Sequence, residues 1–383
     1  MSSVDPSSLE KPSSLRTDAL AYYSKYKKYG PAAFFIGGFI FDILTLSRID
    51  EWFSLTQQFI YLFTLALILH FKVQESIGLW SPQGRFQKIW HYQNEILHFF
   101  MGSLLSSYTL FYFVSSSLSS SFLFMTIIAG LLIINELPQF QQKEIVFKFA
   151  LYHLCICSYF FIVVPIALGS IGVVTFLLAL ASSLAIGSAH FYFLQKKQID
   201  PNIIKKNVAW PVAAICTLLI VLYIFKILPP VPLSVQYMGI YHELEKAPVT
   251  SATGQTKTEF LLKYERSFWK FWQNGAQDFL AEPDDKVVCF ARIFAPARFK
   301  DEIIFHWLKY ERGRWQTMDK VKNQISGGRD AGYRALAVKA NYDVGDWRVQ
   351  IETTDGREIG RIHFTIEKSP HKNLARTFMV DRF

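Results

Sequence analysis

The octapeptide Lys-Ile-Leu-Pro-Pro-Val-Pro-Leu, residues 226–233, separates two kinds of sequence and decides how the chain is organised. Long apolar blocks recur before it, and shorter runs with many charged residues follow it. Its three prolines cannot continue a helix, because proline lacks a backbone N–H and has a fixed φ angle. They favour a stiff, extended spacer instead. We therefore expect a joint here between a membrane bundle and an external domain.

Seven apolar stretches precede the joint, each of roughly 17–24 residues, the length that a bilayer core requires. Most of them lack the polar face that a core helix of a soluble protein carries at helical spacing. The sequence therefore predicts an all-α bundle of seven transmembrane helices. The predicted spans are residues 31–47, 53–71, 96–114, 118–134, 149–167, 171–194 and 208–228.

The positions of Lys and Arg predict the orientation of this bundle. Fourteen of these residues lie in the N-terminal segment and in the second, fourth and sixth connections between spans. The first, third and fifth connections contain only Arg48. Cytoplasmic loops carry an excess of Lys and Arg, so we expect a cytoplasmic N-terminus and, after an odd number of spans, an external C-terminal domain. This fringe also explains part of the net charge of +9 without nucleic-acid binding.

Strand-like runs after the joint predict an all-β domain, an antiparallel sandwich of immunoglobulin-like type. Apolar and polar residues alternate most clearly in 346–353 and 359–367, and Asp355-Gly356 between them is a signal for a tight hairpin. Residues 311–314 give a second turn signal, Glu-Arg-Gly-Arg. The predicted strands are residues 259–264, 286–294, 302–310, 315–321, 333–340, 346–353 and 359–367.

Two segments around these strands are expected to have other structures. Residues 234–257 are predicted to form a linker with turns. The aromatic segment 264–279 is predicted to form a helix, either on the edge of the sandwich or at the membrane surface. The domains expected are a disordered basic N-terminus (1–29), the seven-helix domain (30–228), the joint and linker (229–256), the external β-sandwich (257–368) and a C-terminal tail (369–383).

A series of short motifs in order along the chain resembles a bacterial family, the domain-of-unknown-function family 2914. Those after the joint are Val288-Cys289-Phe290-Ala291-Arg292-Ile293, Ile304-Phe305-His306-Trp307, Gly332-Tyr333-Arg334, Gly345-Asp346-Trp347-Arg348-Val349 and the run at 360–366. Those before or within it are GGFIFDILTLSRID (37–50), LLIINE (131–136), VPIALGSIG (164–172) and LPPVPLS (228–234). The resemblance covers most of residues 30–366. It implies a seven-span protein of the bacterial inner membrane, and it brings no established activity or catalytic residue.

A first candidate site lies within the predicted bundle. Asp42 falls inside the first span, where a carboxylate is costly and commonly functional. Lys226, near the outer end of the last span, is its predicted partner, with Gln57 and Gln58 lining the same region. One interpretation is an ion, proton or polar-ligand site of a small transporter or channel. The other is a structural ion pair that fixes how the helices pack.

A second candidate is a set of polar residues near the predicted cytoplasmic helix ends. Histidine and carboxylate side chains bind metals and respond to pH, but residues of this kind are also ordinary wet helix ends. No HxxxH or HExxH pair occurs, and Cys155, Cys157 and Cys216 are interpreted as small buried apolar residues. We therefore expect no metal site and no cofactor. The set comprises His70, Glu95, His98, Glu136, His153 and His190.

A third candidate is an aromatic recognition surface on the external domain, formed by His306, Trp307, Trp315 and Tyr333. The alternative is that Trp307 is a core residue. We find no nucleophile elbow, phosphate loop or nucleic-acid module, so the sequence indicates no enzyme class. The sequence predicts a polytopic inner-membrane protein, of undetermined oligomeric state, whose external domain binds an envelope protein or a glycan.

Overall fold

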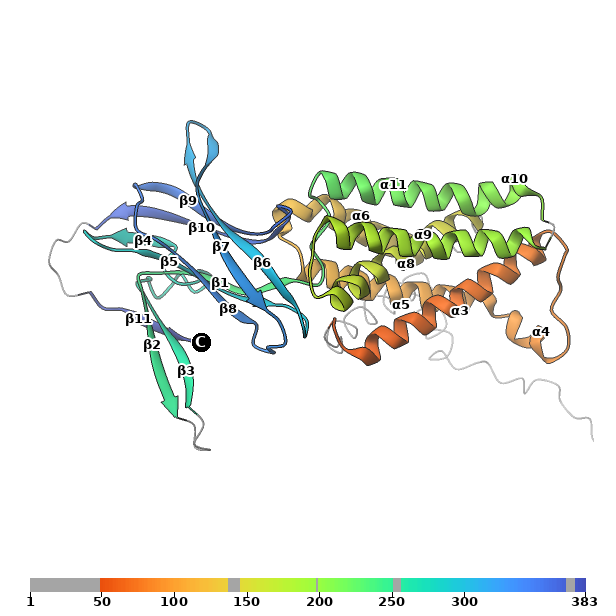
Figure 1. Cartoon of the computed structure of the whole chain (residues 1–383), viewed down its shortest axis with the longest axis horizontal. Coiled ribbons are helices and arrows are strands. Elements are labelled where there is room, and N and C mark those ends of the chain that lie inside the picture. Colours follow the sequence, from red (N-terminus) through yellow and green to blue (C-terminus); the bar gives the residue numbers. More distant parts are fainter. Residues whose placement is uncertain (1–48, 137–144, 198, 251–255, 370–375) are drawn as a thin grey trace, which may run out of the picture.

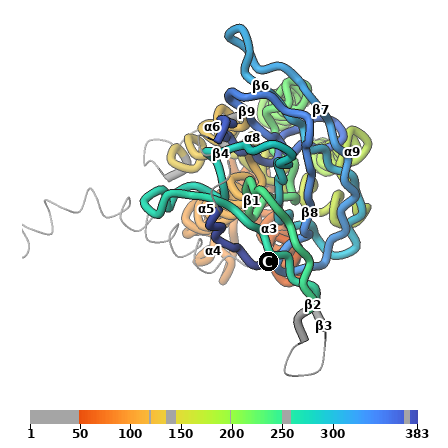
Figure 2. The backbone as a smooth tube through the Cα atoms, turned by 90° about the vertical axis from the view of Figure 1, so that its left-hand side faces the viewer, coloured from red at the N-terminus to blue at the C-terminus, as the bar shows by residue number. Residues whose placement is uncertain are grey.

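The computed structural model describes residues 49–136, 145–197, 199–250, 256–369 and 376–383. A bundle of apolar helices and a β-rich domain lie end to end along the long axis of the molecule (Figure 1). Seen from the β-domain end, the strands lie in front of the helices (Figure 2), so the β domain covers one end of the bundle.

Among the described residues, the helical part contains five stretches that are long and apolar enough to cross a membrane. Four of them are the helices α3, α5, α8 and α9, and the fifth is the continuous stretch Pro201–Ile224. The helices are α3 (Trp52–Ser76), α4 (Arg85–Trp90), α5 (Gln93–Val114), α6 (Leu118–Glu136), α8 (Ile145–Leu168), α9 (Val173–Gln195), α10 (Pro201–Ile204), a π-helical turn (Lys205–Ala209) and α11 (Trp210–Ile224).

The expected count of seven spans is therefore not confirmed. The first predicted span, 31–47, lies outside the described residues. The fourth corresponds to α6, of which the apolar part Ser120–Ile134 lies within the residues whose side chains are described. Among the described helices α8 is the central one, since it packs against α3, α5, α9 and α11. Large apolar side chains such as Phe59, Phe63 and Val174 point away from the bundle, as lipid-facing residues do.

The described strands of the β domain form three sheets. One has the strand order β1-β5-β8, a second has the order β4-β10-β9-β6-β7, and a third has the order β11-β3-β2. The strands are β1 (Ser234–Tyr241), β2 (Glu243–Thr250), β3 (Thr256–Tyr264), β4 (Asp278–Ala281), β5 (Val287–Phe294), β6 (Lys300–Glu311), β7 (Arg314–Ser326), β8 (Tyr333–Lys339), β9 (Gly345–Thr353), β10 (Glu358–Lys368) and β11 (Met379–Arg382).

The predicted strands and hairpins correspond to β3 and β5–β10, and both turn signals are found where expected. Alternation directs Trp347 and Phe364 into a core that all three sheets share, while their sequence neighbours Arg348 and His363 lie on the opposite face of the sheet. β10 also pairs in parallel with β4, which an entirely antiparallel sandwich would not contain. The immunoglobulin-like topology thus stays a prediction.

Three segments differ from expectation. The predicted linker at 234–257 contains β1 and β2, because β1 supplies apolar residues to the core and pairs with the central strand β5. The predicted tail at 369–383 contains β11, which pairs with β3. The aromatic segment 264–279 forms turns and no helix. At Gly275 the φ angle is +71°, and a Cβ there would overlap the carbonyl oxygen of Ile240.

The joint is packed rather than exposed, with residues 228–234 all buried. Leu228 and Val231 belong to the core of the bundle together with Phe294 of the β domain. Ile171, from the loop between α8 and α9, belongs to the core of the β domain. The two hydrophobic cores are therefore in contact, and the prolines lie at that contact.

Candidate functional site

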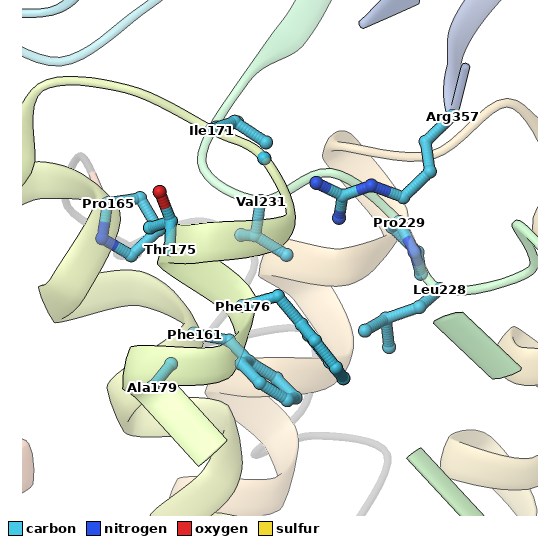
Figure 3. Close-up of a pocket in the computed structure, with 11 residues that line it drawn as sticks. Phe161, Pro165, Ile171, Thr175, Phe176, Ala179, Leu228, Pro229, Val231 and Arg357 are labelled. Carbon is cyan, nitrogen blue, oxygen red and sulfur yellow. The ribbon is translucent and has the colours of Figure 1, made fainter. Parts of the chain in front are cut away.

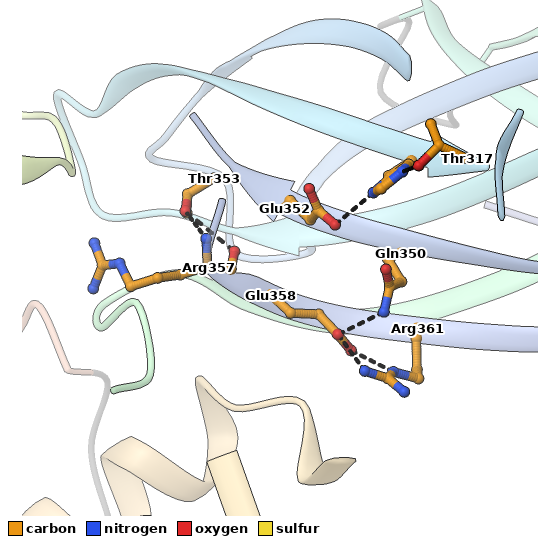
Figure 4. Close-up of polar contacts among 8 residues, drawn as sticks. Thr317, Gln350, Glu352, Thr353, Arg357, Glu358 and Arg361 are labelled. Carbon is orange, nitrogen blue, oxygen red and sulfur yellow. Dashed lines mark hydrogen bonds and ion pairs between the residues drawn. The ribbon is translucent and has the colours of Figure 1, made fainter. Parts of the chain in front are cut away.

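Polar side chains cover the outer face of the five-stranded sheet, on the side opposite the core. Near the bundle, the Glu358 carboxylate accepts hydrogen bonds from Arg361 and from Gln350, the latter at 2.9 Å (Figure 4). Farther along, His306 lies between Glu352, 2.7 Å from Nδ1, and Thr317, 2.8 Å from Nε2. These residues satisfy one another and rigidify the face.

A pocket of about 410 Å³ lies at the end of this face that is away from the bundle. The register places Asp346, Thr365 and Asp278 in one row across β9, β10 and β4. Trp315 and Tyr310, paired on β7 and β6, form another part of the wall. The lining residues are Gln273, Gln277, Asp278, Tyr310, Trp315, Asp346, Trp347, His363, Phe364 and Thr365.

Trp315 is the aromatic centre of the pocket. Its ring lies 5.2 Å from that of Tyr310 and 5.4 Å from that of His363, and the Arg348 guanidinium lies 4.5 Å from its centroid. The Nε atom of Arg348 is buried and has no hydrogen-bond acceptor among the described residues. Burial and the neighbouring guanidinium groups of Arg361 and Arg348 lower the pKa of His363, so this imidazole is neutral at pH 7.

The acidic side of the pocket is held in place by hydrogen bonds. Asp278 accepts from Lys270 at 2.5 Å and from Gln273 at 2.9 Å, and Asp346 accepts from Thr365 at 2.9 Å. Burial opposes ionisation of Asp278, yet these hydrogen bonds and the charge of Lys270 lower the pKa of its carboxyl group. The pocket therefore offers an indole surface beside fixed carboxylate acceptors and amide donors.

An aromatic loop, residues 268–272, lies beside this pocket, because its Lys270 donates a hydrogen bond to the lining residue Asp278. Phe268 is 93% and Phe271 81% exposed, and Trp269 and Trp272 are also exposed. Two backbone hydrogen bonds keep the loop compact. The Lys270 N–H donates to the Ser267 carbonyl, and the Gln273 N–H donates to the Lys270 carbonyl. Exposed apolar surface of this kind commonly marks a binding site.

Of the predicted external surface, only Trp315 lines the pocket. Trp307 is fully buried and packs against Phe364 in the core, so its assignment to a recognition surface was wrong and the core interpretation was right. His306 is hydrogen-bonded to Glu352 and Thr317 within the five-stranded sheet. Tyr333 lies on β8 in another sheet, with Arg329 over its ring. Sequence reasoning missed Asp278, Asp346 and His363, because no local pattern in the sequence shows that β4 pairs with β10.

In the described part of the chain, the β domain is fixed to the end of the bundle at two places. At one, the Ile171 N–H donates to Asp301 at 2.6 Å and the Lys300 N–H donates to the Gly169 carbonyl at 2.9 Å. At the other, the turn between β9 and β10 meets α11 and the α5–α6 loop. Here Tyr223 donates to Asp355 at 2.7 Å, and Ser117 donates to the Glu358 carboxylate.

A narrow cavity of about 20 Å³ lies between these attachments, lined by Phe176, Leu228, Pro229 and Arg357 among others (Figure 3). It is roughly large enough for one water molecule, so it is no ligand site. Arg357 donates to Asp355 at 2.9 Å and lies 4.9 Å from the Tyr223 ring. The junction is therefore a packed contact with a charged centre.

The predicted intramembrane site is not assembled among the described residues. Asp42 lies outside them, so its pairing with Lys226 is untested, and the transporter alternative stays a prediction. Lys226 is exposed at the end of α11, and its ammonium group lies against Gly356 of the β9–β10 turn. Gln57 donates to Tyr61 at 2.7 Å, and Gln58 is buried with its amide nitrogen 3.2 Å from Ser54.

The predicted polar cluster at the far end of the bundle is only partly gathered. The rings of His70 and His190 lie 5.5 Å apart, and His190 Nε2 is buried without a described partner. Glu95 and His98 share the first turns of α5, whereas the side chain of Glu136 is outside the described part. Lys72 and Lys148 both donate to Asn94 near Glu95.

His153 belongs to a different group, which the structure places within the bundle. Its Nε2 lies 3.3 Å from the sulfur of Cys216, and the ligand atoms of His153, Cys157 and Cys216 all lie within 4.8 Å of one another. All three side chains are buried. The i, i+4 spacing of His153 and Cys157 was a signal in the sequence, but Cys216 is contributed by another helix.

Comparison with known families agrees with the resemblance for the β domain. Residues 300–366, from β6 to β10, match the family described as "Protein of unknown function (DUF2914)". No curated protein matches the chain. The matched segment contains Tyr310, Trp315 and His363 of the pocket, whereas the β4 side of the pocket lies before it.

Proposed function

We propose that this chain is a membrane-anchored binding protein whose β domain holds a hydroxyl-rich ligand, a glycan of the cell envelope, in the pocket around Trp315. The observation that carries this proposal is the pairing of an indole surface with fixed carboxylates, Asp278 and Asp346, in one pocket of about 410 Å³. Sugar rings present apolar C–H faces to aromatic groups and hydroxyl groups to such acceptors. The exposed aromatic loop would extend this surface along a longer chain.

The packed junction supports a role for the bundle as a rigid platform. Hydrogen bonds at both attachments and the buried prolines hold the pocket at a fixed distance from the helix ends. A domain attached in this way presents its ligand site at a defined height above the bilayer.

The orientation forms part of the same proposal, with the β domain outside the inner membrane of a bacterium and the N-terminus in the cytoplasm after seven crossings. Lys and Arg support it, because α4 and α10 lie at the end of the bundle away from the β domain (Figure 1). Arg85 and Lys88 are part of α4, and the pairs Lys196-Lys197 and Lys205-Lys206 flank α10. A membrane-impermeant reagent should reach a C-terminal tag, but not an N-terminal tag, in intact spheroplasts. The opposite labelling would refute the orientation.

The ligand site is tested with the full-length protein in lipid nanodiscs and a panel of soluble envelope oligosaccharides. We expect binding by at least one of them and a loss of at least about tenfold in affinity in Trp315→Ala, since a central aromatic contact contributes about 2 kcal/mol or more. Trp52→Ala, which removes an exposed indole from the bundle, is the matched control and should bind normally. Absence of binding across the panel, or equal binding by both variants, would refute the proposal.

A further inference from the structure

The group formed by His153, Cys157 and Cys216 lies on two helices that meet in the middle of the bundle. α8 contributes His153 and Cys157, which the helical period places on one face a single turn apart. α11 contributes Cys216 from the facing side, with 3.3 Å between its sulfur and His153 Nε2. Three residues at most 63 positions apart in the chain thus direct their donor atoms to one point.

The neighbouring helix α9 is shaped to leave room for this group. Gly187 faces it, and a Cβ at that position would lie 3.4 Å from His153 Cε1 and 3.3 Å from the side chain of Val212. One turn earlier, the Ser183 oxygen accepts from the Cys157 thiol at 3.3 Å while its own hydroxyl donates to the Leu180 carbonyl at 2.7 Å. The Ser183 oxygen therefore lies beside the Cys157 sulfur, one of the three donor atoms.

We propose that His153, Cys157 and Cys216 form an intramembrane metal site that takes Zn²⁺. Ligand atoms in a tetrahedral zinc site lie roughly 3.4–3.8 Å apart, given metal–ligand bonds of about 2.0–2.3 Å. The observed separations, 3.3 Å for the nitrogen–sulfur pair and at most 4.8 Å overall, need only small side-chain movements. Two thiolates and one imidazole form a soft donor set that Mg²⁺ and Ca²⁺ do not favour.

Charge selects a divalent cation over a monovalent one. When the ion binds, Cys157 and Cys216 each release a proton, and two thiolates then balance the two charges of Zn²⁺. The neutral imidazole of His153 adds no charge, so the site as a whole is neutral. A neutral site is the form that a buried, apolar bundle tolerates, because an uncompensated charge there is costly. The bound ion ties α8 to α11, the helix that leads into the joint.

The direct test measures metal in the wild-type, full-length protein purified from cells grown with added zinc and copper. We expect close to one equivalent of zinc per chain by elemental mass spectrometry. Growth with cobalt in place of zinc should give thiolate-to-cobalt charge-transfer absorption. Metal-free protein with reduced thiols, copper in place of zinc, or a Cys157–Cys216 disulfide in peptide mass spectrometry would each overturn the proposal.

Two variants and one control assign the ligands. His153→Gln and Cys216→Ser should each lose most of the bound zinc and the cobalt absorption. Cys155→Ser, two positions from Cys157 and equally buried, should keep both, because its sulfur is not part of the group. Zinc retained in both ligand variants would overturn the assignment. If a variant fails to fold, the wild-type metal content and the cobalt spectrum still decide the question.

Discussion

The attachment of the β domain to the bundle can be tested by removing one hydroxyl group. Tyr223→Phe deletes the hydrogen bond to Asp355, whose carboxylate also accepts from Arg357. Burial opposes ionisation of Asp355, but Arg357 and the hydrogen bonds lower the pKa of its carboxyl, so it is charged at pH 7. A hydrogen bond to a charged group contributes about 1.5–3 kcal/mol. The equilibrium ratio of docked to undocked protein should therefore fall by a factor of roughly ten to one hundred.

Two amide groups at the other attachment report on docking. The Ile171 and Lys300 N–H groups donate across the junction, to Asp301 and to the Gly169 carbonyl. If both attachments open together, Tyr223→Phe should speed hydrogen exchange at these two amides by the same ten- to hundredfold factor. The measurement is hydrogen–deuterium exchange with mass spectrometry on the full chain in nanodiscs.

The control is Tyr342→Phe, which deletes a hydrogen bond to the Asp285 carbonyl within the β domain. It should leave exchange at Ile171 and Lys300 unchanged. If Tyr223→Phe speeds exchange only in the turn at 353–357 and not at the two distant amides, the attachments open independently. The description of the junction as one rigid unit would then be wrong.

Two further predictions concern the β domain. Burial and the charge of Arg376 lower the pKa of His242 to about 4 from its ordinary 6.5, so the unfolded chain binds a proton between these values that the folded domain does not. The free energy of unfolding should fall by up to about 3 kcal/mol as the pH decreases through this window. Denaturant midpoints measured over the same pH range should fall less in His242→Gln than in the wild type. An equal fall in both proteins would contradict the assignment. Gly275→Ala should lower the unfolding free energy by at least about 2 kcal/mol, since its Cβ would meet the Ile240 carbonyl. Gly313→Ala, at a similar φ angle in open space, should cost only about 1 kcal/mol, and equal losses would refute the steric argument.

The sequence by itself determined that an apolar helical part precedes a strand-rich part, and it located the strands β3 and β5–β10. Apolar stretches longer than a bilayer core and strictly alternating runs such as 346–353 are local patterns, because helix and strand periods act over a few residues. The Asp355-Gly356 hairpin and the change of structure at the prolines are local in the same sense. The resemblance also located the β6–β10 region, which the family comparison supports.

Local patterns failed where pairing partners are distant. The segment 234–257 contains Gly239 and Pro248, which favour turns, yet β1 is a strand because β5 offers its edge and the core accepts its apolar side chains. Trp307 looked like a recognition residue because its role depends on which face of β6 packs inward. The joint was predicted to be a stiff, extended spacer, and the sequence does not show that Phe294 packs on it.

Only the tertiary structure decided the candidate sites. The pocket joins Asp278 on β4 to Trp315 on β7 across a sheet in which β4 lies beside β10, a strand far from it in the chain. The metal-ligand group joins His153 and Cys157 to Cys216 across two helices, beside Gly187 of α9, where a Cβ would lie 3.4 Å from His153 Cε1. Sequence patterns determine the local backbone conformation of each segment. Chemistry between side chains depends on which elements pack together, and that is settled by the free energy of the whole fold.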